Sequence, residues 1–295
     1  MNVAVMTDTN SGISVEEGKK LGVYVMPMPV LIDGSTYYEG VNLSHEEFYR
    51  FILEGRVVST SQPSPGNVME MWDKILEQYD ELVYIPMSSG LSASCQTALS
   101  LSAEYNGRVQ VVDHHSVSVP QRYAVLDALE LAESGWTAGK IKAALEKTAP
   151  DTIIYIGVDT LEFLKKGGRI TPAVAKMGTL LHIKPLLQIR GELLEACAKV
   201  RGTKGCKRRV IEELKVWVEE YEKSGEPFVI GAAGTFISKD EEEEWINMAH
   251  GAFPGRDIRY DPLAFSIGSH VGPGAFGMAV SKRVPAWEKA VRIDG

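Results

Sequence analysis

A loop rich in serine and glycine, residues 88–94 (Ser-Ser-Gly-Leu-Ser-Ala-Ser), has residue types and spacing suited to binding an anion. It follows an apolar run at residues 82–86 and precedes a helical pattern at residues 96–104. A strand, a small-residue turn and a helix start gather free backbone N–H groups and hydroxyls around one point. The loop therefore predicts an anion site that needs no lysine, for a phosphate, a carboxylate or an oxyanion.

Two further loops carry similar residues. Residues 59–66 lead into a helix start, and residues 270–275 place one histidine, His270, beside a Gly-Pro-Gly turn. Ordinary turn chemistry accounts for each loop taken singly. In a parallel sheet, however, ligands bind beyond the carboxyl ends of the strands, so we expect the loops after Ser59 and Ile85 to face one crevice. There, His270 could donate a hydrogen bond to a carboxylate, whose charge favours the protonated imidazole.

Basic residues and histidines elsewhere are less specific. Two lysines end a short helical pattern at residues 161–167, where the helix dipole favours cations, but Arg169 follows two glycines and is not explained in this way. A second basic stretch, residues 201–209, is equally well explained as a solvated loop and helix face. His114 and His115 follow a strand end without a third ligand at suitable spacing, so no metal site is expected.

The elements that would position these loops follow from hydrophobic periodicity and capping residues. Through about residue 150, apolar runs of strand length alternate with amphipathic helical windows, which predicts a parallel sheet with helices on both faces. Extended segments are expected at residues 3–6, 24–32, 82–85, 109–112 and 152–158. Helix starts are marked by capping residues at Ser14, Ser44, Ser64 and Thr137.

A different pattern follows in the second part of the chain. Two apolar segments flank Arg-Gly-Glu at residues 190–192, which predicts a hairpin and hence antiparallel pairing. The elements expected there are strands at residues 184–189, 193–200 and 228–232 and helices at residues 207–222 and 239–250. We therefore expect an α/β protein with two α/β domains: residues 1–157, with a parallel sheet, and residues 158–295, with a mixed sheet and helices.

Composition excludes several classes of protein. The formal net charge of -8 argues against a nucleic-acid binder, which would carry a basic footprint. The 3 cysteines are odd in number and widely spaced, which argues against a disulfide framework or a zinc site. The sequence shows neither a signal-peptide pattern nor an apolar stretch long enough to span a membrane. A cytoplasmic location is expected.

Taken together and in order, these segments resemble the DegV family of bacterial fatty-acid-binding proteins. Each matching segment is short, but the ordered set is specific to the family. The resemblance runs from residue 3 to about residue 283, and the matching segments are residues 5–9, 60–63, 88–92, 161–170, 184–186 and 270–275. It implies two α/β domains that clasp one long-chain fatty acid.

The resemblance also implies roles for particular residues. Thr60 and Ser92 would bind the fatty-acid carboxylate, and His270 would lie beside the head group. Some family members present the lipid to a bacterial fatty acid kinase and perform no chemistry themselves, so neither a cofactor nor a catalytic residue is expected. Further head-group contacts are assigned to Ser61, Ser89 and Gly90, and partner-docking contacts to Arg169, Arg201 and Lys204.

The sequence departs from the family pattern in three places. Ala93 stands where the family usually has glycine, and Cys95 stands where an aromatic residue is common. Residues 117–121 (Val-Ser-Val-Pro-Gln) replace a small, glycine-containing segment. If residues 117–121 line the acyl tunnel, their bulk would shorten or reroute it. The preferred fatty acid, the tunnel-lining residues and the oligomeric state therefore stay open.

Two alternatives come from other functional classes. The first is a serine-dependent esterase with Ser92 as nucleophile and His270 as base, although the sequence has no Gly-x-Ser-x-Gly elbow and no assignable acidic partner. The second is a regulatory protein that senses lipid and docks a partner through the basic stretch. A nucleotide-dependent kinase is less favoured, because neither glycine-rich nucleotide motif is present. The hypothesis is a fatty-acid-binding protein that passes its ligand to a partner kinase.

Overall fold

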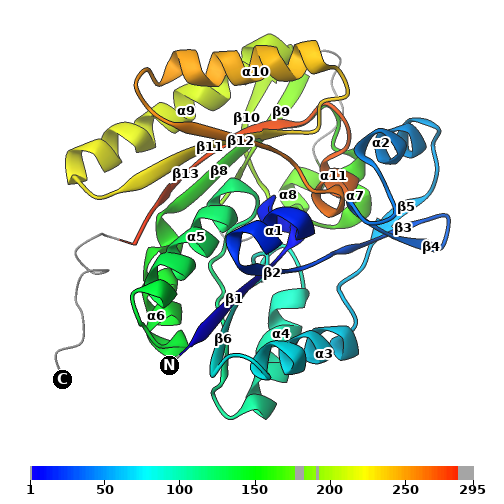
Figure 1. Ribbon diagram of the computed structural model, residues 1–295. Coiled ribbons are helices and arrows are strands. Elements are labelled where there is room, and N and C mark those ends of the chain that lie inside the picture. Colours follow the sequence, from blue (N-terminus) through cyan, green and yellow to red (C-terminus); the bar gives the residue numbers. More distant parts are fainter. Residues whose placement is uncertain (1, 177–182, 191–192, 285–295) are drawn as a thin grey trace.

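The computed structural model describes residues 2–176, 183–190 and 193–284, and within these ranges the strands form three sheets (Figure 1). The first is a four-stranded parallel sheet in the order β2-β1-β6-β7. Its strands are β1 (Val3–Asp8), β2 (Val23–Met26), β6 (Glu81–Ile85) and β7 (Val109–Val111). The predicted parallel sheet is thereby confirmed, although residues 24–32 do not form one extended segment.

Helices cover both faces of this sheet, as predicted. The alternation of side chains along a strand places Val3 and Val5 against α5 and α6, and Ala4 and Met6 against α3 and α4. Side-chain caps at Ser14, Ser44, Ser64 and Thr137 accept backbone N–H groups as expected, so these helix starts are set by local chemistry. The helices are α1 (Val15–Leu21), α3 (Pro65–Leu76), α4 (Ser94–Ser102), α5 (Val119–Glu133) and α6 (Ala138–Thr148).

The second sheet has six strands in the order β10-β9-β8-β13-β11-β12. It is mixed, because β11 and β12 pair in parallel while the other neighbours are antiparallel. Its strands are β8 (Thr152–Gly157), β9 (Ile183–Ile189), β10 (Glu195–Arg201), β11 (Phe228–Gly234), β12 (Ile258–Pro262) and β13 (Phe276–Lys282). The predicted hairpin is confirmed in β9 and β10, but its turn residues 191–192 lie outside the described residues.

One strand lies in a different sheet from the one the sequence predicts. We expected residues 152–158 to close the N-terminal region, yet β8 pairs with β13 and β9. The chain therefore enters the six-stranded sheet at Thr152. Local periodicity predicts that a strand forms, but pairing with distant segments decides which sheet the strand joins. A domain division at residue 157 stays a prediction.

Two helices cover one face of the six-stranded sheet, and α5 lies on the other side, between the two sheets (Figure 1). These helices are α9 (Thr203–Ser224) and α10 (Lys239–Ala252). Ile153, Tyr155, Met278 and Val280 pack in a buried core with residues of both. The chain is thus layered as helices, parallel sheet, helices, mixed sheet and helices. No helix among the described residues is long and apolar enough to cross a membrane.

A third, small sheet was not expected. Strands β3 (Pro29–Ile32), β4 (Ser35–Tyr38) and β5 (Val58–Thr60) pair antiparallel in the order β4-β3-β5 and pack with α2 (His45–Leu53). We call residues 29–60 the lobe, which lies at the right of Figure 1. Pro27 separates β2 from β3, and a proline cannot donate a hydrogen bond that would continue the strand ladder. An Asp-Gly turn, Asp33-Gly34, connects β3 and β4, with φ of 50° at Asp33.

The lobe rests on α11 (Phe265–Val271), which follows β12. The rings of Phe48 and Phe265 stack with their centroids 4.3 Å apart. Glu39 Oε2 accepts a hydrogen bond of 3.0 Å from the backbone N–H of Phe265. Gly268 leaves room for the lobe, since a Cβ there would lie 2.8 Å from the Tyr49 hydroxyl. These contacts fix the position of the lobe relative to the helix that carries His270.

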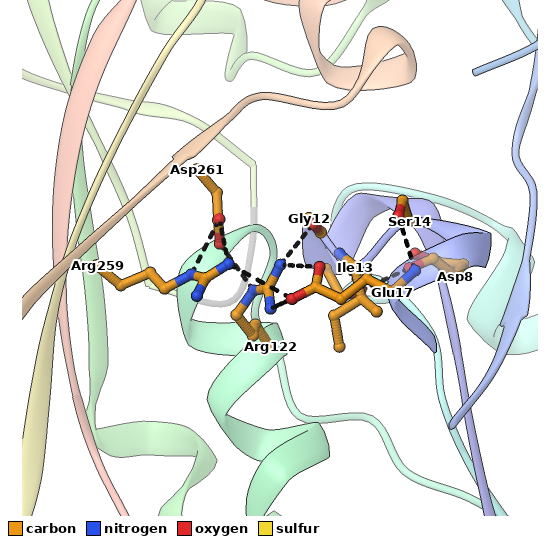
Figure 2. A network of polar contacts seen from close by, with 9 residues as sticks. Asp8, Gly12, Ile13, Ser14, Glu17, Arg122, Arg259 and Asp261 are labelled. Atoms are coloured by element: carbon orange, nitrogen blue, oxygen red, sulfur yellow. Dashed lines mark hydrogen bonds and ion pairs between the residues drawn. The ribbon is translucent and has the colours of Figure 1, made fainter. Parts of the chain in front are cut away.

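A buried ionic network joins the parallel-sheet region to the six-stranded sheet (Figure 2). Arg122 on α5 is 2% exposed, and its Nη1 lies 2.7 Å from Glu17 Oε1. Its Nε lies 2.8 Å from Asp261 Oδ2 on β12. Arg259 pairs with the other Asp261 oxygen at 3.0 Å, and Arg122 Nη2 also donates to the Gly12 carbonyl at 2.7 Å. Each buried charge therefore has an opposite charge beside it.

Candidate functional site

A mostly apolar cavity of about 220 Å³ lies between the carboxyl end of the parallel sheet and the face of the six-stranded sheet that α9 leaves uncovered. The loops after β5, β6 and β7 line one side of it, and strands β8, β9, β11 and β13 line the other. Helix α11 also contributes to the wall. So do α7 (Glu162–Gly167) and the segment that follows α7. The predicted crevice therefore exists, but the residues after Ser59 reach it from the lobe and not from the parallel sheet.

Four small residues form part of the cavity wall, which we call the floor: Gly231, Ala233, Gly277 and Ala279. They alternate along β11 and β13, and the antiparallel register pairs Gly231 with Ala279 and Ala233 with Gly277. Residues one apart on a strand point to opposite faces, so all four share the cavity face. Without large side chains here, the space between the sheets stays open. Sequence reasoning missed the floor, although the alternation of small residues is visible in the sequence.

The three residues assigned to the carboxylate all line this cavity. The Thr60 hydroxyl and His270 Nε2 lie 2.9 Å apart in a hydrogen bond that joins the lobe to α11. Ser92 lies in the β6–α4 loop. Its Oγ lies 3.0 Å from Ser94 Oγ and accepts a hydrogen bond of 3.2 Å from the Ser94 N–H. Segments separated by more than 170 residues therefore meet at one end of the cavity, where they offer hydroxyls and an imidazole.

His270 is held in its neutral form. Burial lowers its pKa to about 4, and the positive charge of Arg169 adds to this effect. The imidazole packs directly against Gly167, where a Cβ would lie 2.0 Å from Nδ1. Nδ1 is buried and has no hydrogen-bond partner among the described residues. The Gly-Gly pair before Arg169 is thereby explained: Gly167 accommodates the ring, and Gly168 ends α7 with φ of 71°.

Arg169 lies on the cavity wall, whereas the sequence interpretation grouped it with partner-docking residues. Its Nε donates to the carbonyl of Leu91 at 3.2 Å, which orients the guanidinium toward the serine-rich loop. It also lies close enough to His270 to lower that residue's pKa. Among the described lining residues, Arg169 is therefore the one Lys or Arg of the cavity. The turn chemistry of the two glycines could not reveal this position.

Backbone N–H groups of the serine-rich loop already donate to other groups of the protein, contrary to the expectation of free donors. The N–H groups of Leu91 and Ser92 both donate to the Ser88 carbonyl at 3.1 Å. Ser89 N–H donates to Asp113 Oδ1 at 3.2 Å, and Gly90 N–H donates to Ser88 Oγ at 3.2 Å. These four N–H groups are thus occupied by acceptors within the loop and by Asp113, and the loop offers its hydroxyls to a ligand.

Of the three residues expected to make further head-group contacts, Ser61, Ser89 and Gly90, only Ser61 is among the described lining residues. Ser61 lines the cavity, with its Oγ donating to the Gln62 carbonyl at 3.1 Å. Ser89 and Gly90 are not among the lining residues. Their expected role as direct head-group contacts is therefore not supported by the geometry.

The basic stretch at residues 201–209 is only partly exposed. Lys207 is buried, and its Nζ lies 2.7 Å from Glu244 Oε2. Arg209 pairs with Glu213 at 2.5 Å. Arg201 and Lys204 are exposed at the end of β10 and the start of α9.

The segment that departs from the family pattern does line the cavity. Residues 117–120 form part of its wall at the start of α5, and Val119 packs against Gly231. A Cβ on Gly231 would lie 2.4 Å from Val119 Cγ1, so the floor glycine and the bulky valine are matched. The sequence therefore identified a segment that shapes the cavity.

The geometry does not favour the esterase alternative. Ser92 Oγ contacts Ser94, while His270 Nε2 contacts Thr60, so the proposed nucleophile and base are not paired. No carboxylate among the described residues orients the imidazole, because Nδ1 lacks a partner. Among the described residues there is also no cluster that could hold a metal ion.

Comparisons with known proteins agree with this architecture. A family model described as "Uncharacterised protein, DegV family" matches residues 2–283. A DegV domain-containing protein of Deinococcus radiodurans is 33% identical over 281 residues, which cover 95% of this chain and 98% of the relative.

Two solved structures of fatty-acid-binding proteins are also similar. A DegV family protein from Thermus thermophilus has 30% identity and a TM-score of 0.84, covering 96% of this chain and 100% of the other. DegV of Bacillus subtilis, a fatty acid binding protein, has 26% identity and a TM-score of 0.83 over the same shares. The match extends over nearly the whole chain in both sequence and structure. The chain belongs to the DegV family.

Proposed function

We propose that this protein binds one long-chain fatty acid, with the acyl chain in the cavity and the carboxylate at its polar end. The observation that carries the proposal is the cavity itself, whose apolar walls end at Thr60, Ser92, His270 and Arg169. The fatty-acid binding described for similar structures supports the same ligand class.

The apolar walls would supply most of the affinity. Burying an acyl chain yields about 0.8 kcal/mol per CH₂, so a long chain contributes roughly 10 kcal/mol before the costs of binding. A water-sized group needs about 10–15 Å³ of cavity volume on the usual measure. The 220 Å³ cavity exceeds that minimum by more than about tenfold.

At the polar end, hydroxyls and a single cation are suited to one carboxylate. The Thr60 hydroxyl can rotate from His270 toward a ligand oxygen, and the Ser92 hydroxyl can donate from the opposite side. Arg169 supplies a positive charge at the cavity wall. A bound carboxylate would raise the pKa of His270 from its low value, because a nearby negative charge favours the imidazolium.

The test of ligand binding is native mass spectrometry of protein purified from a bacterial host, followed by uptake of oleate and palmitate. We expect one bound fatty acid per chain. Thr60→Ala and Ser92→Ala each remove a hydrogen bond to a charged group, which is worth about 1.5–3 kcal/mol. The matched control is Ser100→Ala, because this exposed α4 serine donates to the Gln96 carbonyl and lies outside the cavity wall.

Two results would contradict this proposal. Absence of any copurifying fatty acid together with no uptake of either lipid would show that the cavity holds something else. Ester hydrolysis lost in Ser92→Ala would favour the esterase alternative.

We also propose that the protein presents the fatty acid to a partner kinase and performs no chemistry of its own. Arg201 and Lys204 are exposed, which supports their assignment as docking residues, whereas Arg169 lines the cavity. A variant with Arg201→Glu and Lys204→Glu should keep its fatty-acid affinity and lose phosphorylation of the bound fatty acid by a bacterial fatty acid kinase. Unchanged phosphorylation would assign the docking surface elsewhere.

A further inference from the structure

Ser118, at the start of α5, is a polar residue of the cavity wall that the proposed fatty-acid site does not use. It lines the cavity and is 7% exposed, and its Oγ has no hydrogen-bond partner among the described residues. Buried hydroxyls in folded proteins are nearly always paired, with protein, water or ligand. The unpaired Ser118 hydroxyl therefore needs a partner that the protein itself does not provide.

The usual role of a serine at this position is helix capping, and Ser118 does not perform it. A capping serine is extended and accepts an N–H of the second or third helical residue. Ser118 instead has φ of 60° and ψ of -137°, and its side chain makes no capping hydrogen bond. Pro120 removes one of the two N–H groups that a cap would use. The backbone N–H of Ser118 donates to the Asn10 carbonyl at 2.8 Å, which holds the residue in place.

Ser118 lies some way along the cavity from the carboxylate end. Its neighbour Val119 packs on Gly231 of the floor. His270 lies near the carboxyl end of β11, since Gly272, two residues later, accepts a hydrogen bond of 2.7 Å from Thr235. Thr235 is four positions after Gly231 along the extended chain, which corresponds to roughly 13 Å. An acyl chain anchored beside His270 would therefore pass Ser118 with its middle carbons.

The start of α5 favours an oxygen atom at this point. The helix has 15 residues, and its N-terminus carries a partial positive charge that attracts hydrogen-bond acceptors. The other serine nearby is already occupied, because the Ser266 hydroxyl donates to Asn10 Oδ1. Ser118 thus offers the free hydroxyl on this part of the wall, among the described residues.

We propose that Ser118 and the N-terminus of α5 form a second polar subsite, which binds an oxygen atom carried in the middle of the acyl chain. The ligand class is a long-chain fatty acid with a mid-chain hydroxyl or oxo group. The inference rests on the proposed fatty-acid function and deepens it, by adding recognition of chain oxygenation to recognition of the carboxylate.

The test is a thermodynamic cycle with two variants and three ligands. The affinities of stearate, 10-hydroxystearate and 12-hydroxystearate are measured for the unmodified protein, Ser118→Ala and Ser118→Gly. We expect the affinity of a hydroxystearate relative to stearate to fall roughly 3- to 10-fold in both variants, as for the loss of one neutral hydrogen bond. Glycine suits the positive φ of this position, so Ser118→Gly keeps the test valid if alanine disturbs folding.

A second comparison separates this inference from the function on which it rests. Ser92→Ala should weaken stearate and both hydroxystearates by the same factor, because it acts at the carboxylate. Unchanged relative affinities in both Ser118 variants, with stearate still bound, would overturn the subsite and leave fatty-acid binding intact. Failure of the unmodified protein to bind stearate and both hydroxystearates would instead overturn the proposed function.

Discussion

His270 owes its position to a neighbour without a side chain. The ring occupies the space where a Cβ of Gly167 would lie, and the Thr60 hydroxyl holds the far nitrogen. We expect Gly167→Ala to displace the imidazole and weaken fatty-acid binding by roughly 10-fold, the value of about one lost hydrogen bond. Titration with a fluorescent fatty acid would measure it.

The matched control for that substitution is Gly139→Ala in α6. No atom lies within 4 Å of a Cβ at Gly139, and helical alanine is favoured over glycine by about 0.5–1 kcal/mol. This variant should bind fatty acid normally and unfold at a slightly higher denaturant concentration. Equal affinities in the two variants would show that His270 does not depend on Gly167.

Two buried histidines make stability depend on pH in the acid range. Burial lowers the pKa of His114 and of His270 to about 4. Below the ordinary pKa of about 6.5 the unfolded chain binds more protons than the folded one, so the free energy of unfolding falls between pH 6.5 and 4. Between pH 7 and pH 4.5, the free energy of unfolding should fall by on the order of 2 kcal/mol less in His270→Gln than in the unmodified protein. Urea unfolding at the two pH values measures this difference. An identical pH dependence in the variant would contradict the buried neutral state.

The sequence predicted correctly which loops lie together. It predicted less well what individual side chains and backbone N–H groups do there. Thr60, Ser92 and His270 converge because topology brings loops to one edge, a rule that sequence alone can apply. The inward hydrogen bonds of the serine-rich loop depend on its exact turn, and the place of Arg169 depends on Leu91 and His270. Both are products of tertiary structure that local patterns do not contain.

At the scale of elements, the partly buried carboxylate of Glu39 is one of the groups that hold the lobe to α11. Burial raises the pKa of Glu39 to about 7, although the Phe265 N–H hydrogen bond acts in the opposite direction. An acid whose pKa is raised on folding contributes stability below its unfolded pKa of about 4.5, and this contribution is lost as pH rises through about 7. The docked lobe is therefore less stable in mild base than in mild acid.

Glu39→Gln tests this contact. The glutamine carbonyl can still accept the Phe265 N–H, but no charge has to be buried. We expect the variant to exceed the unmodified protein in unfolding free energy by on the order of 2 kcal/mol at pH 8, with little difference at pH 5. A variant that is less stable than the unmodified protein at pH 8 would show that the ionised carboxylate stabilises the lobe.

Element boundaries were predictable where local chemistry sets them. The starts of α2, α3 and α6 follow their capping residues Ser44, Ser64 and Thr137 as expected. The lobe sheet was not recognised, because its strands of three or four residues are too short for periodicity to register. Likewise, the membership of β8 in the six-stranded sheet depends on pairing with segments more than 25 residues away.

At the scale of the whole molecule, the network around Arg122 joins the regions on either side of the cavity (Figure 2). Arg122→Met keeps most of the side-chain volume but removes the buried cation of the network and leaves Asp261 and Glu17 with Arg259 alone. Removing one partner of a buried ion pair costs about 3–5 kcal/mol, so we expect a loss of that order in urea unfolding.

The control for the Arg122 substitution is Lys20→Ala, which breaks the exposed pair with Glu16. Surface ion pairs contribute little to stability, so its unfolding midpoint should be unchanged. A loss in Arg122→Met no larger than in this control would mean that the network does not join the two regions.

The floor of the cavity ties the binding site to the stability of the whole chain. Its four small residues alternate, on β11 and β13, with residues such as Ile230 and Met278 that form the core beneath α9 and α10. One ladder of backbone hydrogen bonds therefore serves both faces, and the floor cannot open locally without disrupting that core. Amide protons of the floor should consequently exchange with solvent only through global unfolding, which is unusual for residues that line a ligand cavity.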